Sequence, residues 1–184
     1  MTNQQILILE VTKKYCLSQP IKIRVFQSSD SERVIKLISD IIVNEFTFKL
    51  EFDTLDSDIL AIEETYNKSD GGCFWIAESI DDNNTQQQKI VGTTAIRNLK
   101  QFEFTCELKR MYVLNEFRRL GLGQKLLNRA IEYAKSVGYS RMVLDSSKTL
   151  YAARALYLKK GFVDIPRYND NYRADVFMER KLSS

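Results

Sequence analysis

The sequence predicts an α/β protein with a mixed sheet and helices on both of its faces. Residues 103–145 read as strand, helix and strand, and a right-handed crossover of this kind makes its two strands parallel. The strand-like stretches at 73–79 and 89–99 predict an antiparallel hairpin before it. Because one sheet then contains both kinds of pair, we expect a mixed sheet in a single domain.

The first half of the chain supplies three further elements and a loop. Residues 21–26 alternate as a strand, and a serine or aspartate at 28–30 then caps a helix whose apolar residues recur at helical spacing. Asp56 predicts the N-cap of a second helix that runs to about residue 67, before a glycine pair at 71–72. The polar stretch at 81–88 predicts a mobile loop within the hairpin.

The second half alternates between strands and helices. A long strand at 103–114 leads into a helix that starts near residue 120 and stops at Gly138. Residues 141–145 read as a short buried strand. A helix at 150–160, closed by Gly161, and a last strand at 172–181 complete the domain.

Length and composition indicate one folded domain at residues 21–184 behind an N-terminal extension at 1–20. The chain has 184 residues, 44% of them hydrophobic and 28% charged, which suits a sizeable core. Residues 6–11 predict an extra strand, since no basic start and no cleavage site mark a signal peptide. No apolar run approaches the roughly 18 residues that span a membrane. We therefore expect no membrane partner and a cytoplasmic protein, with a nuclear location left open.

Charge and the missing histidine exclude several classes of function. A net charge of +3 is too small to indicate a nucleic-acid partner. The absence of histidine excludes Ser-His-Asp and Cys-His triads and histidine-ligated metals. The three cysteines fit neither a zinc site nor a disulfide framework, and we expect Cys106 to be a small buried apolar residue. We therefore expect no metal, and acid–base chemistry by carboxylates, tyrosine, cysteine, lysine or water.

The stretch YVLNEFRRLGLGQKLLNRA, residues 112–130, predicts a phosphate-binding loop. Two of the chain's 7 glycines, Gly121 and Gly123, follow an arginine pair at the start of a helix. A helix N-terminus presents unpaired N–H groups and the positive end of a dipole, and glycines let a ligand approach it. The arginines add charge-assisted hydrogen bonds. A phosphate-bearing ligand is therefore expected here.

The residues alone leave the identity of that ligand open. A Walker loop needs G-x-x-x-x-G-K-[ST], which the chain lacks. A dinucleotide fingerprint needs a third glycine where Leu126 stands, although Asp145 supplies an acid about 20 residues further on. A helix start with a flexible lead-in and no ligand is the remaining alternative.

Two motifs resemble those of the GCN5-related N-acetyltransferase (GNAT) superfamily. Arg118-x-x-Gly121-x-Gly123 after ELKRMYV is similar to its acetyl-coenzyme-A signature, and AARALYLKKGF at 152–162 is similar to its second motif. The resemblance extends over residues 21–182 and is strongest at 107–162. The segments CELKRMYV, LDSSKTLYAARALY and DIPRYNDNYRADVFMERKL look most like those of small-molecule amine acetyltransferases.

This resemblance implies a fold and a reaction. The fold is a mostly antiparallel sheet of six to seven strands with one splayed parallel pair. The reaction is direct transfer of the acetyl group of acetyl-CoA, the co-substrate, to a primary amine in a ternary complex. The acceptor is a small metabolite such as an amino acid or a polyamine. A protein N-terminal or lysine acetyltransferase and a non-catalytic acyl-CoA-binding module are the alternatives, and a homodimer is left open.

The resemblance also assigns coenzyme-binding residues. A bulge in the strand at 103–114 frees the N–H groups of Met111, Tyr112 and Val113 for the thioester carbonyl and the pantetheine arm. The pyrophosphate is expected on the glycine loop. Its residues are Arg118, Arg119, Leu120, Gly121, Leu122, Gly123 and Gln124. Because a bulge breaks strict alternation, the sequence does not show which side chains of this strand face the cleft.

Glu107 and Tyr157 are the candidate catalytic residues that the resemblance implies. Glu107 is the general base, directly or through water, and the alternative is an ion pair with Arg97 or Lys109. Tyr157 is the general acid, at the position where the second motif carries a tyrosine, and the alternative is a packed aromatic residue. The family often has an asparagine at the position of Leu150, so one usual coenzyme or water contact is in question.

Arg97, Lys109 and Tyr168, with the phenylalanine-rich loop at 46–52, are the candidate acceptor-binding residues. Two cations suit a substrate that carries a carboxylate. The alternative is that Arg97 and Lys109 are ordinary surface residues of the sheet.

Overall fold

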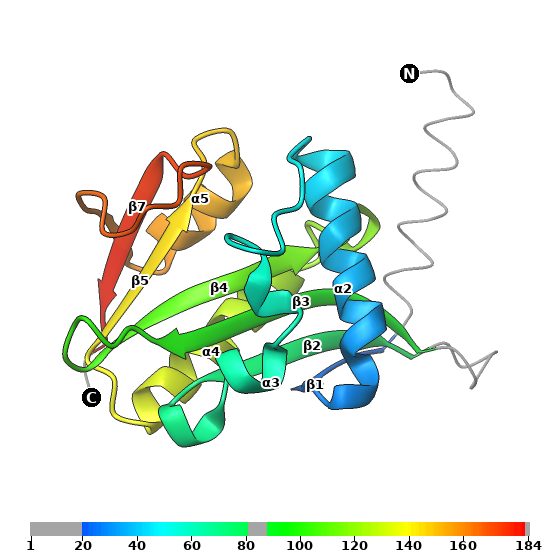
Figure 1. Cartoon of the computed structure of the whole chain (residues 1–184), viewed down its shortest axis with the longest axis horizontal. Coiled ribbons are helices and arrows are strands. Elements are labelled where there is room, and N and C mark those ends of the chain that lie inside the picture. The colour runs from blue at the N-terminus through cyan, green and yellow to red at the C-terminus, as the bar shows by residue number, and fades with distance from the viewer. Residues whose placement is uncertain (1–19, 81–87, 183–184) are drawn as a thin grey trace.

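The computed structural model describes residues 20–80 and 88–182, which form a seven-stranded sheet in the order β1-β2-β3-β4-β5-β7-β6 (Figure 1). The strands are β1 (Ile21–Val25), β2 (Cys73–Ser79), β3 (Lys89–Asn98), β4 (Thr105–Val113), β5 (Arg141–Ser146), β6 (Val163–Asp164) and β7 (Val176–Lys181). Neighbouring strands are antiparallel except β4 and β5, which are parallel. The predicted mixed sheet is therefore confirmed. The strand expected at residues 6–11 and most of the loop expected at 81–88 lie outside the described residues.

Helices cover both faces of the sheet, as predicted (Figure 1). On one face lie α2 (Ser31–Asp40), its π-helical continuation η2 (Ile41–Glu45) and the short α3 (Ile62–Thr65). On the other face lie α4 (Leu122–Ser136) and α5 (Tyr151–Lys159). Short 3₁₀ turns complete the described helices: η1 (Ser28–Asp30), η3 (Ser57–Ile59), η4 (Lys68–Asp70) and η5 (Asn115–Phe117). None of the helices described is both long and apolar enough to cross a membrane.

Apolar residues at helical spacing hold α4 against the sheet. Leu126, Leu127, Ala130 and Ala134 are fully buried and lie one to two turns apart on one face of this helix. Leu127, Ala130 and Ala134 pack with buried residues of β2 to β5, including Leu144, and Leu126 packs with residues of β2 and β3. Burial of each such leucine contributes roughly 1.5–3 kcal/mol, so the crossover between the two parallel strands is firmly fixed.

The predicted helix from residue 56 to 67 is wrong, because this segment contains only the short η3 and α3, with η4 following it. The Asp56 side chain does not cap a helix. Its buried carboxylate accepts hydrogen bonds from the Glu51 N–H and from the side chains of Arg110 and Arg173. An aspartate that binds two distant arginines cannot also satisfy the N–H groups of a helix start.

The C-terminal strands also differ in detail from expectation. The two-residue β6 was not predicted, and β7 begins at Val176 rather than at residue 172. Residues 171–175 instead form a loop in which the Arg173 N–H donates to the Asn171 side chain and the Ala174 N–H donates to the Asn171 carbonyl. This loop lies close to β5, since the Asp175 N–H donates to the Ser146 carbonyl.

The two parallel strands form a fork. Pairing between β4 and β5 covers only Thr105 to Leu108, and its last pair is Leu108 with Leu144. Beyond that pair β4 continues to Val113 and β5 to Ser146, and Figure 1 shows the two strands diverging. Among the described residues, no strand therefore pairs with the β5-facing edge of β4 after Leu108.

A bulge in β4 lies at the start of this fork. The register with β3 passes from Ala95–Lys109 to Thr93–Tyr112, so β4 has one residue more than β3 in this interval. Arg110 carries the distortion, with a φ of 49°. The extra residue reverses the alternation of side chains. Leu108 and Met111 both face α4, and Tyr112 faces the cluster under α2.

The side chain of Arg110 fixes the bulge to the segment before α3. Its guanidinium donates to Asp58 Oδ2 at 2.8 Å, to Asp56 Oδ1 at 3.1 Å and to the Leu55 carbonyl at 2.8 Å. The Tyr66 hydroxyl donates to Asp58 as well. Burial alone raises the pKa of Asp58, but the Arg110 guanidinium outweighs it and holds that pKa below its ordinary value. Asp58 is therefore ionised and paired with Arg110.

Replacing Arg110 by methionine tests this anchor. The change keeps a long side chain but leaves the buried Asp58 without its cation and Asp56 with Arg173 alone. We expect the free energy of unfolding to fall by about 3–5 kcal/mol, measured by urea denaturation with circular dichroism.

Arg154→Met is the matched control for this change. Arg154 pairs with Asp164 at 2.8 Å, and both side chains are substantially exposed, by 40% and 56%. Its loss should cost less than about 1 kcal/mol. If Arg110→Met is no more destabilised than Arg154→Met, the bulge does not depend on this anchor.

Candidate active site

A cavity opens where β4 and β5 separate. Its walls come from the ends of both strands, from α5 and from the segments after α2 and before β7. The lining residues that matter for chemistry are Lys109, Met111, Asp145, Ser146, Tyr157 and Arg173. Phe46 and Phe48 contribute an apolar wall, which agrees with the predicted phenylalanine-rich loop.

The open edge of β4 presents backbone donors. The Leu114 N–H donates to the Val91 carbonyl at 3.0 Å, on the β3 side. In an antiparallel ladder the N–H groups of successive residues point to opposite edges. Those of Met111 and Val113 therefore point towards the fork, whereas that of Tyr112 points towards β3. Tyr112 belongs to the cavity through its side chain.

The glycine loop adds a second set of backbone donors. The first intrahelical bond of α4 runs from the Lys125 N–H to the Gly121 carbonyl at 3.1 Å. The N–H groups of Leu122, Gly123 and Gln124 precede it and have no acceptor within the helix. Gly121 has a φ of 80°, and a Cβ built there would meet no atom within 4 Å. Open space thus adjoins these donors, and a coenzyme pyrophosphate fits them.

The arginine pair is divided between two environments. The Arg118 guanidinium donates to the Val113 carbonyl at 2.8 Å and to Glu45 Oε2 at 2.6 Å. It therefore ties the glycine loop to the end of β4 and to η2. Arg119 is exposed on the loop, at a φ of 63°. Of the two arginines expected to flank the phosphates, Arg118 is held by these contacts and Arg119 has an exposed side chain.

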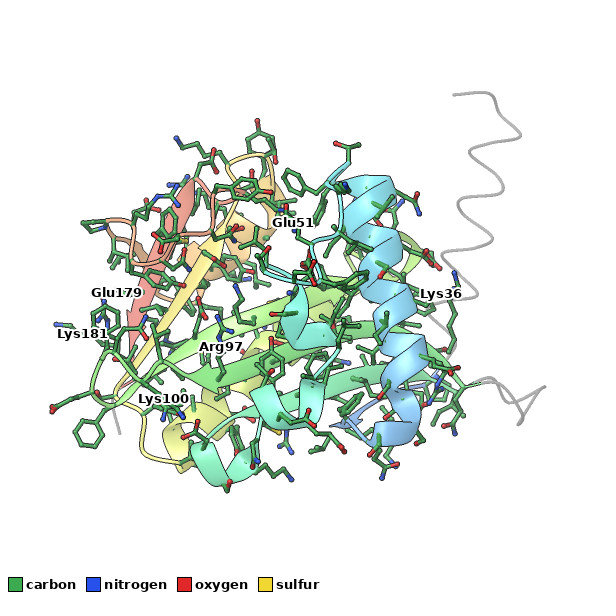
Figure 2. The ribbon with its side chains drawn as sticks, in the orientation of Figure 1. Lys36, Glu51, Arg97, Lys100, Glu179 and Lys181 are labelled. Carbon is green, nitrogen blue, oxygen red and sulfur yellow. The ribbon has the colours of Figure 1, made fainter. Side chains whose placement is uncertain are left out.

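Glu107 lies in a buried polar cluster on the face of the sheet that α2 and α3 also cover. It is fully buried, and Arg97, its cross-strand neighbour, donates to Oε2 at 2.8 Å. Oε1 accepts from the Tyr168 hydroxyl at 2.9 Å and from Asn169 Nδ2 at 3.2 Å. Lys109 Nζ is 3.9 Å from the same oxygen. The structure thus brings together all four predicted residues, and Figure 2 shows Arg97 on this face of the sheet.

Asp145 is the second carboxylate of this cluster, and it lines the cavity. Lys109 Nζ lies 3.2 Å from Oδ1, and the side-chain amides of Asn169 and Asn171 each donate to Oδ2 at 2.9 Å. Burial alone would raise the pKa of Asp145, but Lys109 and the two amides outweigh it and lower that pKa. The two asparagines were not identified from the sequence. Their only signal is the Asn-x-Asn spacing in the segment before β7.

Tyr157 is packed against a neighbouring ring and also lines the cavity. Its ring is buried and lies 5.8 Å from the ring of Phe162, so it is a packed aromatic residue. It also lines the cavity, where its hydroxyl lies 3.8 Å from Met111 Sδ. Burial raises the pKa of Tyr157 well above its ordinary value, so the phenol stays protonated. Leu150 lines the same cavity.

The described cysteines supply no thiolate nucleophile. The described cysteines and carboxylates form no metal site. Cys73 and Cys106 are free and buried, as predicted for Cys106. Burial raises the pKa of the Cys106 thiol to about 12, so it is not a nucleophile at neutral pH. Within residues 20–80 and 88–182, no three acidic or cysteine side chains are grouped closely enough to hold a metal ion.

A family model matches the part of the chain that contains the glycine loop. Residues 36–162 match the model of the acetyltransferase (GNAT) family. The chain belongs to the GNAT acetyltransferase family. In this family member the sheet is antiparallel except for the pair β4–β5, which differs from the mostly parallel sheet of a dinucleotide-binding fold. Leu126, where that alternative needs a glycine, is fully buried between helix and sheet.

The GNAT chain is similar to several curated relatives. It is 34% identical over 108 residues to N-acetyltransferase family 8 member 3 of Rattus norvegicus, which covers 59% of this chain and 46% of that protein. It is 36% identical over 108 residues to N-acetylaspartate synthetase of Danio rerio, covering 59% of this chain and 36% of that protein. The chain thus spans less than half the length of these two relatives.

Solved structures share the GNAT fold over most of the chain. An acetyltransferase of the GNAT family from Staphylococcus aureus Mu50 superposes with a TM-score of 0.78 and 29% identity, covering 89% of this chain and 100% of that one. PaiA N-acetyltransferase from Thermoplasma acidophilum, in complex with coenzyme A, gives a TM-score of 0.65 at 21% identity, covering 88% and 99%. The predicted fold, with its splayed parallel pair, is therefore confirmed.

Gly121→Glu tests the phosphate loop of this GNAT chain. The substitution places a side chain and a negative charge in the open space beside the α4 donors. We expect the affinity for acetyl-CoA, measured by calorimetry, to fall by about tenfold or more, which corresponds to about 1.4 kcal/mol.

Gly138→Glu controls for backbone strain. Gly138 also has a positive φ, 91°, and a built Cβ there would likewise meet nothing within 4 Å, but it lies at the other end of α4. This variant should bind acetyl-CoA as the parent does. Unchanged affinity in a folded Gly121→Glu variant rules out the glycine loop as the site.

Proposed function

We propose that this chain transfers the acetyl group of acetyl-CoA to a primary amine by direct attack in a ternary complex. One observation carries the proposal. A single cavity at the β4–β5 fork adjoins the open edge of β4 and contains Tyr157, with the α4 N-terminus beside it. Gly123 in that N-terminus lies close to Met111, since a Cβ built there would be 3.7 Å from the Met111 side chain.

Backbone groups hold the co-substrate in this proposal. Acetyl-CoA, when bound, supplies an activated thioester and a thiolate leaving group, so no covalent enzyme intermediate is needed. The N–H groups of Met111 and Val113 bind the thioester carbonyl, where negative charge develops during attack, and the pantetheine arm. The α4 N-terminus and Arg119 bind the pyrophosphate. Arg118 fixes the glycine loop to the end of β4 through its hydrogen bond to the Val113 carbonyl.

Tyr157 is the proposed proton donor to sulfur. Its hydroxyl lies beside the Met111 thioether at the fork, and its raised pKa keeps the proton available. A carboxylate accepts the proton that the amine loses, and the polar cluster contains two, Glu107 and Asp145. Glu107 acts through water if it is the base, because it is fully buried behind Arg97 and Tyr168.

A small metabolite is the proposed acceptor. The relative named N-acetylaspartate synthetase supports an acceptor that carries both an amine and a carboxylate. Lys109 is the cation of the predicted acceptor-binding set that lines the cavity, whereas Arg97 and Tyr168 hold Glu107 behind it. A homodimer and a cytoplasmic location stay predictions. A protein acceptor and a non-catalytic acyl-CoA-binding module are the alternatives.

Acetyl transfer to a panel of amines tests the proposed function. The panel contains aspartate, lysine, spermidine and a peptide with a free N-terminus, and thiol release from acetyl-CoA is measured. We expect turnover with at least one of the three metabolites. Turnover with the peptide alone favours a protein acceptor, and binding of acetyl-CoA without any turnover favours the non-catalytic module.

Thermal shifts test the choice of coenzyme. The fork and the glycine loop suit acetyl-CoA, so at about 100 times its dissociation constant this ligand should add about 2.7 kcal/mol to stability and raise the melting temperature. NAD and NADP should cause no shift under the same conditions. A shift with NADP and none with acetyl-CoA contradicts the assignment of the glycine loop.

Tyr157→Phe separates catalysis from packing at this residue. The ring and its contacts stay, but the proton donor is lost. We expect kcat to fall by about 100- to 10,000-fold, with little change in melting temperature or in acetyl-CoA affinity, measured by steady-state kinetics and calorimetry.

Tyr151→Phe is the matched control, because Tyr151 lies on the same helix and its side chain is 79% exposed. It should leave kcat unchanged. Tyr157 is only a packing residue if its phenylalanine variant turns over within about threefold of the parent while chemistry limits the rate.

A further inference from the structure

Asp145 stands at the base of the fork. The last pair between the parallel strands is Leu108 with Leu144, so Lys109 and Asp145 are the first residues beyond it on their strands. Asp145 lines the same cavity as Tyr157 and Met111. Within the described part of the chain, Glu107 is not among the residues that line this cavity. Asp145 is therefore the carboxylate of the cluster that an acceptor can meet directly.

The two carboxylates also differ in their remaining capacity for hydrogen bonds. A carboxylate offers about four lone-pair sites. Glu107 accepts from Arg97 on one oxygen and from Tyr168 and Asn169 on the other, with Lys109 nearby. Asp145 accepts the hydrogen bonds of both asparagine amides on Oδ2. Its Oδ1 is contacted by Lys109 Nζ at 3.2 Å, which leaves room for a further donor.

We propose that Asp145 receives the amino group of the acceptor, binding it as an ammonium and taking the proton that the nitrogen loses during acetyl transfer. This inference rests on the proposed function. Charge favours it, because Asp145 is ionised and anchored by Lys109, Asn169 and Asn171. The lowered pKa of Asp145 keeps it ionised at neutral pH, as binding of a cation requires.

The protons and electrons of this step balance. The ammonium at Asp145 loses one proton to solvent, and the nitrogen lone pair then forms the C–N bond with the acetyl carbon. The C–S bond breaks, and its electron pair stays on sulfur. Asp145 takes the second proton from nitrogen, and Tyr157 gives its hydroxyl proton to sulfur. Return of a proton from Asp145 to Tyr157 through solvent restores both groups.

Glu107 then has a different task. Asn169 Nδ2 donates to Glu107 Oε1 at 3.2 Å and to Asp145 Oδ2 at 2.9 Å, so one amide links the two carboxylates across the fork. Glu107, held by Arg97, thereby fixes Asn169, and Asn169 fixes Asp145. In this account Glu107 is a positioning residue, and Asp145 is the residue that touches the substrate.

Asp145→Asn tests the inference, with Asp164→Asn as its matched control. Asp164 lies in β6, its side chain is 56% exposed, and it pairs with Arg154. With the best amine of the panel, we expect kcat/KM of Asp145→Asn to fall by about 100-fold or more. Its acetyl-CoA affinity by calorimetry should equal that of the parent. Asp164→Asn should match the parent in both measurements.

Asp145→Glu is the second variant if the asparagine variant does not fold. It keeps the charge for Lys109 but moves the carboxylate by one methylene, and a misplacement of about 1 Å costs on the order of 100-fold in rate. A folded variant that keeps kcat/KM within about threefold of the parent overturns the inference and leaves the proposed function standing. A parent that acetylates no amine overturns the proposed function itself.

A double variant separates Asp145 from Glu107. Arg97→Gln with Glu107→Gln removes both charges of that pair while keeping groups that can hydrogen-bond to Asn169 and to each other. We expect a loss in kcat/KM at least tenfold smaller than that of Asp145→Asn, about 1.4 kcal/mol in barrier. A loss equal to or larger than that of Asp145→Asn makes Glu107 the base and overturns the inference.

Discussion

The buried ion pairs of Arg110 with Asp56 and Asp58 are the interaction on which the rest of the site depends. Arg110 is held at a positive φ, a conformation that costs a non-glycine residue about 1–3 kcal/mol. The two carboxylates offset that cost by holding its side chain against the segment before α3. The bulge that results reverses the alternation of β4, so that Met111 faces α4 and the Met111 and Val113 N–H groups point into the fork.

The same network reaches the acceptor side of the cavity. Asp56 also accepts from Arg173, whose guanidinium donates to Glu51 Oε1 at 3.0 Å. Arg173 belongs to the segment before β7, which carries the asparagines that hold Asp145. One aspartate thus connects the bulged edge of β4 with the loop that holds Asp145. Removing an arginine on either side leaves Asp56 with fewer partners, and an unpaired buried charge is costly to stability.

Local signals in the sequence account for what could be predicted. The helical spacing of leucines and alanines in α4, the glycines of the loop and the strand–helix–strand order each depend on neighbouring residues. They predicted the mixed sheet, which is confirmed, and a phosphate loop, which stays a prediction. The role of Asp56 depends on Arg110, 54 residues away, so an N-cap was the local expectation. Asn169 and Asn171 carry no chemical signature until the fold places them over Asp145. The position of the bulge follows from the same distant contact, which is why the cavity-facing residues of β4 could not be read from alternation.

Hydrogen exchange of individual backbone amides, with and without acetyl-CoA, tests the central claim most directly. The account predicts slower exchange on binding at Met111 and Val113 and at Leu122 to Gln124, the donors at the fork and at the α4 N-terminus. Tyr112 should change little, because its N–H already points to β3. Protection confined to other parts of the sheet, with Met111 and Val113 unaffected by the ligand, would contradict the claim that the bulge of β4 creates the acetyl-binding edge.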